Sequence, residues 1–173
     1  RLRPMTDPDL TPKAATAATA AANQEAATLP FLTGDDADRE RATRGRVLAA
    51  PGQVLHGGGW PTWDLDAYHF LDGPPPPEVN PSLWRQAQLN NEAGLFEIAP
   101  GFHQVRGLDL ANMTTIEGDE GRIVIDPLTS VQTARAALAM VEEHLGARPV
   151  TAVIYTHSHV DHFGGVRGVI DEA

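Results

Sequence analysis

The chain has 173 residues, no cysteine and a formal net charge of −10, a length that allows one domain plus an extension. The absence of cysteine excludes disulfides and thiolate metal sites, so any transition metal must be held by His and carboxylate side chains. Nucleic-acid binding needs clustered Lys and Arg, and a spanning helix needs roughly 18 apolar residues; the sequence has neither, so no nucleic-acid partner and no transmembrane segment are expected.

Residues 1–60 are predicted to be an N-terminal arm and extension. Residues 14–22 are alanine and threonine, which favours a weak surface helix or mobile arm because there is little apolar area to bury. The acidic stretch 35–38 lacks the spacing of a calcium loop and is interpreted as the solvated start of a helix over residues 39–46. The glycines 57–59 lack the pattern of a phosphate loop and predict a turn.

Four aromatic side chains are expected to pack this extension onto the domain: Trp60, Trp63, Tyr68 and Phe70. Residues 73–77 read as a stiff proline linker. A short helix is predicted over residues 81–90, with Asn80 as its cap and Pro81 in its first position.

From residue 95 onward the pattern predicts strands, namely 95–98, 102–105, 113–117 and 122–125, with a hairpin loop at 118–121. Thr129 and Gln132 fit a capping box, and apolar residues then recur at helical spacing up to Leu145. Gly146 and Pro149 end that helix, and residues 150–155 form the next strand. The order strand, helix, strand predicts a βαβ unit in an α/β fold, and sites in such sheets form where strands end.

Four potential metal ligands lie directly after this last strand: His157, His159, Asp161 and His162. A His-x-His spacing on extended backbone sends both imidazoles to one side, so that pair can share one metal. Asp161 and His162 follow as the chain turns and can face a second metal nearby. Imidazole and carboxylate ligands without thiolate suit zinc or a similar divalent ion, and two close metals lower the pKa of a shared water. Asp161 is also expected to orient that water, which makes it the predicted catalytic residue.

Asp126 ends the strand 122–125 and is expected to lie beside the ligand loop. There it would accept a hydrogen bond from a ligand imidazole and fix its tautomer; the alternative is a turn residue that leads into the helix. Ser158 is interpreted as a small spacer between ligands. The histidines outside the motif have no ligand-like neighbour in sequence, and no function is assigned to them: His56, His69, His103 and His144.

The spacing His-x-His-x-Asp-His after a strand is similar to the signature of the metallo-β-lactamase superfamily, whose fold is an αββα sandwich. Flanking blocks narrow the resemblance to the linear alkyl sulfatases, the family of dodecyl sulfate (SDS) hydrolases. The blocks that carry it are residues 80–90, 94–98, 104–107, 109–114, 123–130 and 155–166.

The resemblance implies zinc-dependent hydrolysis of alkyl sulfate esters to alcohol and inorganic sulfate, with water attacking carbon and the C–O bond breaking. It implies two zinc ions per active site, with His157 and His159 on one and Asp161 and His162 on the other. Family members are homodimers in which the two-zinc domain is followed by a dimerisation domain and a sterol-carrier-like domain. Their export favours a periplasmic or secreted bacterial location, with the cytoplasm as the alternative.

Residues 61–173 are therefore expected to be only the N-terminal portion of the catalytic domain, with the later domains and the remaining ligands outside this chain. The rest of the same polypeptide or a second chain would complete the site, and the segment alone is expected to be inactive. Two other readings stay open. The protein is another hydrolase of the superfamily, such as a lactonase, phosphodiesterase or β-lactamase, or it is an inactive fragment with a structural role.

Overall fold

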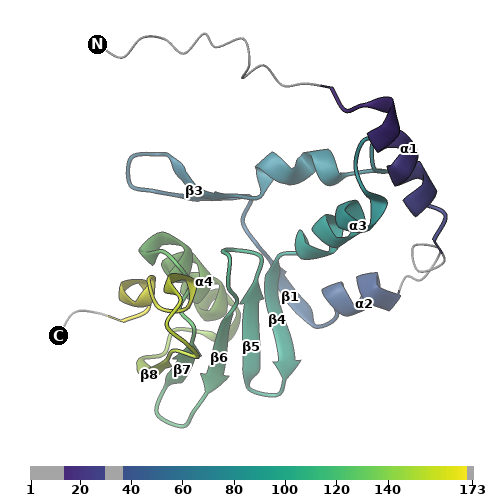
Figure 1. Cartoon of the computed structure of the whole chain (residues 1–173). Coiled ribbons are helices and arrows are strands. Elements are labelled where there is room, and N and C mark those ends of the chain that lie inside the picture. Colours follow the sequence, from purple (N-terminus) through teal and green to yellow (C-terminus); the bar gives the residue numbers. More distant parts are fainter. Residues whose placement is uncertain (1–13, 30–36, 171–173) are drawn as a thin grey trace, which may run out of the picture.

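The structure, a computed structural model, describes residues 14–29 and 37–170 (Figure 1). Its centre is a six-stranded sheet in the order β1-β4-β5-β6-β7-β8, and β2 and β3 form a separate hairpin. The strands are β1 (Arg46–Ala49), β2 (Gln53–Leu55), β3 (Pro61–Asp64), β4 (Gly94–Ala99), β5 (Phe102–Arg106), β6 (Met113–Glu117), β7 (Arg122–Ile125) and β8 (Val150–Ile154). The helices are α1 (Ala17–Ala26), α2 (Ala37–Thr43), α3 (Pro81–Asn90) and α4 (Val131–Leu145), with 3-10 turns η3 (Asp66–Leu71), η4 (Val160–His162) and η5 (Val166–Gly168).

The predicted βαβ unit is present as β7, α4 and β8. The strands from β1 through β7 pair antiparallel along the sheet, whereas β7 and β8 are parallel, with Val124 opposite Val153 and Ile125 opposite Ile154. Parallel neighbours require a crossover connection, and α4 supplies it. Both strands therefore end at the same edge of the sheet, and β8 is the last strand in the order.

The core lies between one face of the sheet and α4. Its fully buried members include Val124 on β7, Met113 on β6, and Ala137 and Val141 on α4. These residues follow the period of two along strands and the helical period along α4, as amphipathic elements require.

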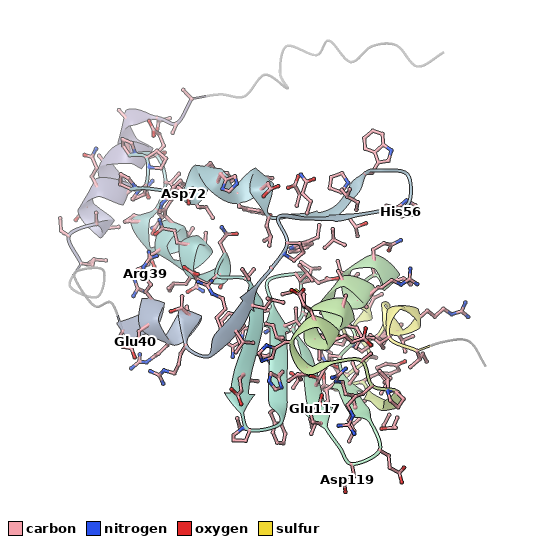
Figure 2. All side chains as sticks on the ribbon, turned by 180° about the vertical axis from the view of Figure 1, so that it is seen from behind. Arg39, Glu40, His56, Asp72, Glu117 and Asp119 are labelled. Atoms are coloured by element: carbon pink, nitrogen blue, oxygen red, sulfur yellow. The ribbon has the colours of Figure 1, made fainter. Side chains whose placement is uncertain are left out.

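The edge of the sheet where β7 begins is tied to the C-terminus of α4 by a buried arginine. Arg122 is fully buried; its Nε donates to Glu117 Oε1 at 2.5 Å and its Nη2 to the carbonyl of Gly146 at 2.6 Å. A buried guanidinium is tolerated when its charge is paired, as it is here by Glu117, although Nη1 of Arg122 is a buried donor without a hydrogen-bond partner. Figure 2 shows Glu117 and Asp119 at this end of the molecule, opposite the hairpin that carries His56.

The start of α4 differs from the capping box expected at Thr129. Ser130 is the N-cap, and its Oγ accepts from the backbone N of Thr133 at 3.1 Å. The hydroxyl of Thr129 instead donates to Asp109 Oδ1 at 2.6 Å. Both residues carry a hydroxyl, and a carboxylate distant in sequence decides which of them caps the helix.

The helices α1, α2 and α3 gather near the β1 and β4 side of the sheet, whereas the β2–β3 hairpin lies on the side of α4 (Figure 1). The alanine-rich stretch forms α1, which buries no residue, as expected for a weak surface helix. The helix at residues 81–90 is confirmed as α3, and its cap Asn80 accepts from Ser82 N at 2.9 Å. Strand β1 pairs with β4 in the main sheet, although it precedes residue 61, the predicted start of the catalytic portion. Residues 35 and 36 of the acidic stretch lie outside the described residues.

Only one of the four aromatic side chains packs the extension onto the core as expected. Trp63 packs against the core cluster, and its Nε1 donates to the carbonyl of Gly107 at 2.8 Å. Trp60 is 77% exposed. Phe70 is also exposed, and its ring contacts those of Tyr68 and of Trp84 on α3 rather than the core cluster. Sequence alone does not say which way these side chains point. Within the described residues, no helix is both long and apolar enough to cross a membrane.

Candidate metal centre

Asp126 and Thr156 are the residues that follow β7 and β8 at the shared strand edge. The carboxylate of Asp126 accepts three hydrogen bonds: Oδ1 from Thr156 N at 2.8 Å, and Oδ2 from Thr156 Oγ1 at 2.7 Å and from His162 Nδ1 at 2.8 Å. The backbone N of Asp126 also donates to the carbonyl of Ile154 at 2.9 Å, which extends the pairing of the two strands. One carboxylate therefore joins both ends of the loop that carries the predicted ligands.

Asp126 is ionised at neutral pH. Burial alone would raise the pKa of Asp126, but the hydrogen bonds from Thr156 N, His162 and Thr156 Oγ1 outweigh it and hold the pKa below its ordinary value. An ionised carboxylate accepts the proton on His162 Nδ1, and in the neutral ring this tautomer places the lone pair on Nε2. Sequence reasoning placed Asp126 beside a ligand imidazole, and the structure shows that the imidazole is that of His162.

His162 and Asp161 form one pair of donor atoms, with Nε2 and Oδ2 3.3 Å apart. His157 and His159 form the other, with His157 Nε2 and His159 Nδ1 3.1 Å apart. The rings of His157 and His162 lie 4.0 Å apart between centroids, so the two pairs are neighbours. All four predicted ligands thus converge.

The spacing within each pair fits a shared divalent ion. Two nitrogens bound to one tetrahedral zinc at roughly 2.0–2.1 Å are about 3.3 Å apart, close to both observed separations. Over residues 14–29 and 37–170, however, no group of three or more His, Asp or Glu side chains is arranged to hold an ion. The four residues fit a metal as two half-sites, since catalytic zinc sites use about three protein ligands.

Thr156 is a site residue that sequence reasoning missed. Its hydroxyl donates to Asp126 Oδ2 and lies 3.0 Å from His157 Nδ1, so it links the carboxylate to a ring of the first pair. With His157 Nδ1 as donor to that hydroxyl, His157 Nε2 faces His159 without a proton. A hydroxyl residue placed directly before the motif was the available signal.

Gly164 and Gly165 allow the chain after the ligands to lie directly on the start of α4. A Cβ on Gly164 would collide with the carbonyl of Thr129, and one on Gly165 with the carbonyl of Pro127. The backbone N of Gly165 donates to the carbonyl of Leu128 at 2.8 Å. Figure 1 shows this final segment, in yellow, against α4. The ligand loop is thus held at its far end by backbone contact that only glycine permits.

Two other features lie apart from the ligands. His103 is buried on β5, and its ring centroid is 5.8 Å from that of His144. His144 lies at the C-terminal end of α4, and the ligand loop packs against the other end of that helix. The sequence did not predict that these two histidines are neighbours. A cleft of about 870 Å³ is bordered by α2, α3, η3 and the segment 106–112, and none of the four predicted ligands lines it.

Residues 106–173 match the Metallo-beta-lactamase superfamily. The chain is 54% identical to an (R)-specific secondary-alkylsulfatase from Pseudomonas sp. over 163 residues. The aligned region covers 93% of this chain and 24% of that protein. Residues 106–173 thus carry a metallo-β-lactamase domain, and the relatives that match most of the chain are alkylsulfatases. Its fold is the mixed α/β fold that the sequence predicted.

Two further alkylsulfatase-type relatives cover most of the chain. A linear primary-alkylsulfatase from Pseudomonas sp. is 50% identical over 94% of this chain and 24% of its own length. The alkyl/aryl-sulfatase BDS1 of Saccharomyces cerevisiae is 47% identical over 84% of this chain and 22% of its own length. The chain spans about a quarter of these relatives.

A solved structure gives the same result. The sec-alkylsulfatase Pisa1 from Pseudomonas sp., described as stereoselective and inverting, superposes with a TM-score of 0.87 at 54% identity. The match covers 92% of this chain and 25% of that protein. The arrangement of strands that brings β7 and β8 to one edge is therefore shared with an alkylsulfatase of known structure.

Proposed function

We propose that the protein containing this chain is a metal-dependent sulfuric ester hydrolase that converts alkyl sulfates to alcohol and inorganic sulfate. The observation that carries the proposal is the convergence of two donor pairs at the common end of β7 and β8. The alkylsulfatase homologues support sulfate ester hydrolysis as the reaction.

We assign His157 and His159 to one zinc ion and Asp161 and His162 to a second. Bound divalent ions supply Lewis-acid activation of a water and neutralise charge on the ester. Each pair needs at least one further ligand from elsewhere in the complete protein, since catalytic zinc uses three protein ligands. The convergence of all four donors supports this assignment.

Residues of this chain hold the proposed ligands in their working state. The carboxylate of Asp126 keeps the proton of His162 on Nδ1, so that Nε2 is the atom available to bind metal. Thr156 does the same for His157 through its Nδ1. Rings whose tautomer and orientation are fixed in advance need no reorganisation when they bind an ion.

Asp161 has the second role of directing the attacking water. We propose that the carboxylate of Asp161 accepts a hydrogen bond from the water. This orients the water so that a lone pair on the water oxygen points at the ester carbon. The new C–O bond forms from water, the bond between carbon and the sulfate oxygen breaks, and the electron pair leaves with sulfate. The carboxylate of Asp161 takes one of the two protons of the water and passes it to solvent, and the alcohol keeps the other proton together with the oxygen of the water.

Two measurements on the intact protein test this function. Sulfate release from secondary and primary alkyl sulfates, with no turnover of lactones, phosphodiesters or β-lactams, separates a sulfatase from other hydrolases of the superfamily. Hydrolysis in ¹⁸O-water then decides which bond breaks: label in the alcohol supports C–O cleavage, whereas label in sulfate contradicts it. Loss of activity on removal of zinc with a chelator, and recovery on its return, is expected.

We also propose a homodimer, because the family that this sequence resembles is dimeric. Light scattering on the intact protein is expected to give twice the mass of one polypeptide; a monomeric mass would contradict it. An exported location stays a prediction.

A further inference from the structure

Asp109 is a buried carboxylate that the proposed function does not use. It lies between β5 and β6 with 7% of its surface exposed, and its hydrogen-bond donors belong to Leu110, Thr129 and Thr133 rather than to the proposed ligands. Its Oδ1 accepts from Leu110 N and from Thr129 Oγ1, both at 2.6 Å; its Oδ2 accepts from Thr129 N at 3.1 Å and from Thr133 Oγ1 at 2.5 Å. Burying a carboxylate is unfavourable unless it is fully hydrogen-bonded, and here three of the four donors belong to Thr129 and Thr133.

The segment that Asp109 holds has an unusual backbone. Between β7 and α4, Asp126 has φ 56° and Leu128 has φ 63°, so two non-glycine residues within three positions are left-handed. Such conformations are disfavoured for residues with a Cβ and persist only where surrounding contacts impose them. Burial of the Leu128 side chain is one such contact, and the grip of Asp109 on both the N–H and the hydroxyl of Thr129 is another.

This strained segment, residues 126–129, contacts the ligand loop at both of its ends. At one end the carboxylate of Asp126 accepts from Thr156 N, and at the other the carbonyl of Leu128 accepts from Gly165 N. The position of the proposed ligands between Thr156 and Gly165 therefore depends on the backbone conformation of residues 126–129.

We propose that Asp109 is a positioning residue for the metal centre, acting through Thr129 to hold residues 126–129 in the conformation that presents the ligand loop. The inference rests on the proposed metal-dependent function. The hydrogen bond from Thr133 Oγ1 to the same carboxylate stabilises the start of α4 instead, because Thr133 lies in the first turn of that helix. The two threonines thus separate positioning of the ligand loop from stability of the helix.

Thr129→Val and Thr133→Val are matched variants, since each removes one hydroxyl donor to the same carboxylate with little change in volume. Asp109→Asn removes the charge at nearly constant shape. In the intact protein freed of metal, hydrogen exchange at the Thr156 and Gly165 amides is expected to rise at least about tenfold in Asp109→Asn and Thr129→Val. In Thr133→Val it should stay within about twofold of the parent, even where the melting temperature falls.

Zinc affinity of the intact protein, measured by competition with a chromophoric chelator, gives the second readout. Asp109→Asn and Thr129→Val are expected to bind zinc about tenfold more weakly, in the range seen when outer contacts of a metal site are removed, and Thr133→Val within about twofold of wild type. Equal effects of the two threonine variants on exchange and affinity would overturn the positioning role. A wild-type protein that binds no zinc would overturn the proposed function instead, while amide exchange would still decide whether Asp109 holds the loop. Should Asp109→Asn not fold, the threonine pair decides alone.

Discussion

The two ends of the β7–α4–β8 unit each hold a buried charged group, but they use it differently. Where the strands begin, the guanidinium of Arg122 is neutralised by Glu117 and donates to the carbonyl of Gly146. Where the strands end, Asp126 orients His162 so that its Nε2 lone pair points toward Asp161 rather than to a hydrogen-bond donor. A buried charge paired within the fold is costly to disrupt, whereas a charge that orients a neighbouring imidazole prepares a binding site.

The largest effect at the strand-end site is expected for Asp161→Asn. It should lower kcat for alkyl sulfate hydrolysis by at least about 10³-fold, because the amide does not accept the proton or direct the water as a carboxylate does. Zinc on the His157 and His159 pair should be largely retained, as elemental analysis of the intact protein can show. Activity near that of wild type would refute the role given to Asp161.

At the opposite end, Arg122→Met should cost about 3 kcal/mol of the free energy of unfolding, because it leaves Glu117 without its buried partner. Arg148→Met is the matched control: Arg148 pairs with the same Glu117 at 3.3 Å but is a third exposed, and about 1 kcal/mol or less is expected. Urea unfolding of the metal-free protein measures both. A loss of zinc affinity in folded Arg122→Met would break the contrast between the two ends.

Asp126→Asn should weaken zinc binding about 10- to 100-fold with a smaller effect on folding. Asparagine tolerates the left-handed backbone of this position, so the loop keeps its path while the charge that orients His162 is lost. Chelator competition gives the affinity, and the melting temperature of the metal-free protein serves as the control. Unchanged affinity would mean that the carboxylate does not orient the imidazole.

The smallest effect is expected for His103, which lies near the end of the β7–α4–β8 unit that holds Arg122. Burial lowers the pKa of His103, so below pH of about 6.5 the unfolded chain binds a proton that the folded chain resists. Its unfavourable effect is therefore absent at higher pH and grows as pH falls through the unfolded pKa. His103→Leu should flatten the loss of stability between about pH 6.5 and 5, whereas His144→Gln, at an exposed ring, should keep most of it. Equal slopes for wild type and His103→Leu would contradict this.

Sequence predicted the elements that local periodicity defines. The strands around residues 95–125, the βαβ unit and the helix capped by Asn80 all follow from spacing, turn residues and caps. The four ligand positions and Asp126 came from a motif and from the rule that parallel strands end together.

What sequence did not predict depends on contacts between distant residues. Ser130 rather than Thr129 caps α4 because Asp109, twenty residues earlier in the chain, takes the Thr129 hydroxyl. Trp60 and Phe70 are exposed although their composition suggested packing. Neither outcome has a periodic signal, because each is set by which side chain arrives from elsewhere in the fold.

The most direct test of the central account is the zinc content of the intact protein, wild type against His157→Ala, measured together with sulfate release. Wild type is predicted to hold two zinc ions per polypeptide and to release sulfate from an alkyl sulfate. His157→Ala is predicted to lose one zinc ion together with turnover. Equal zinc content in both proteins, or full activity without bound metal, would contradict the assignment of the loop after β8 as the metal centre.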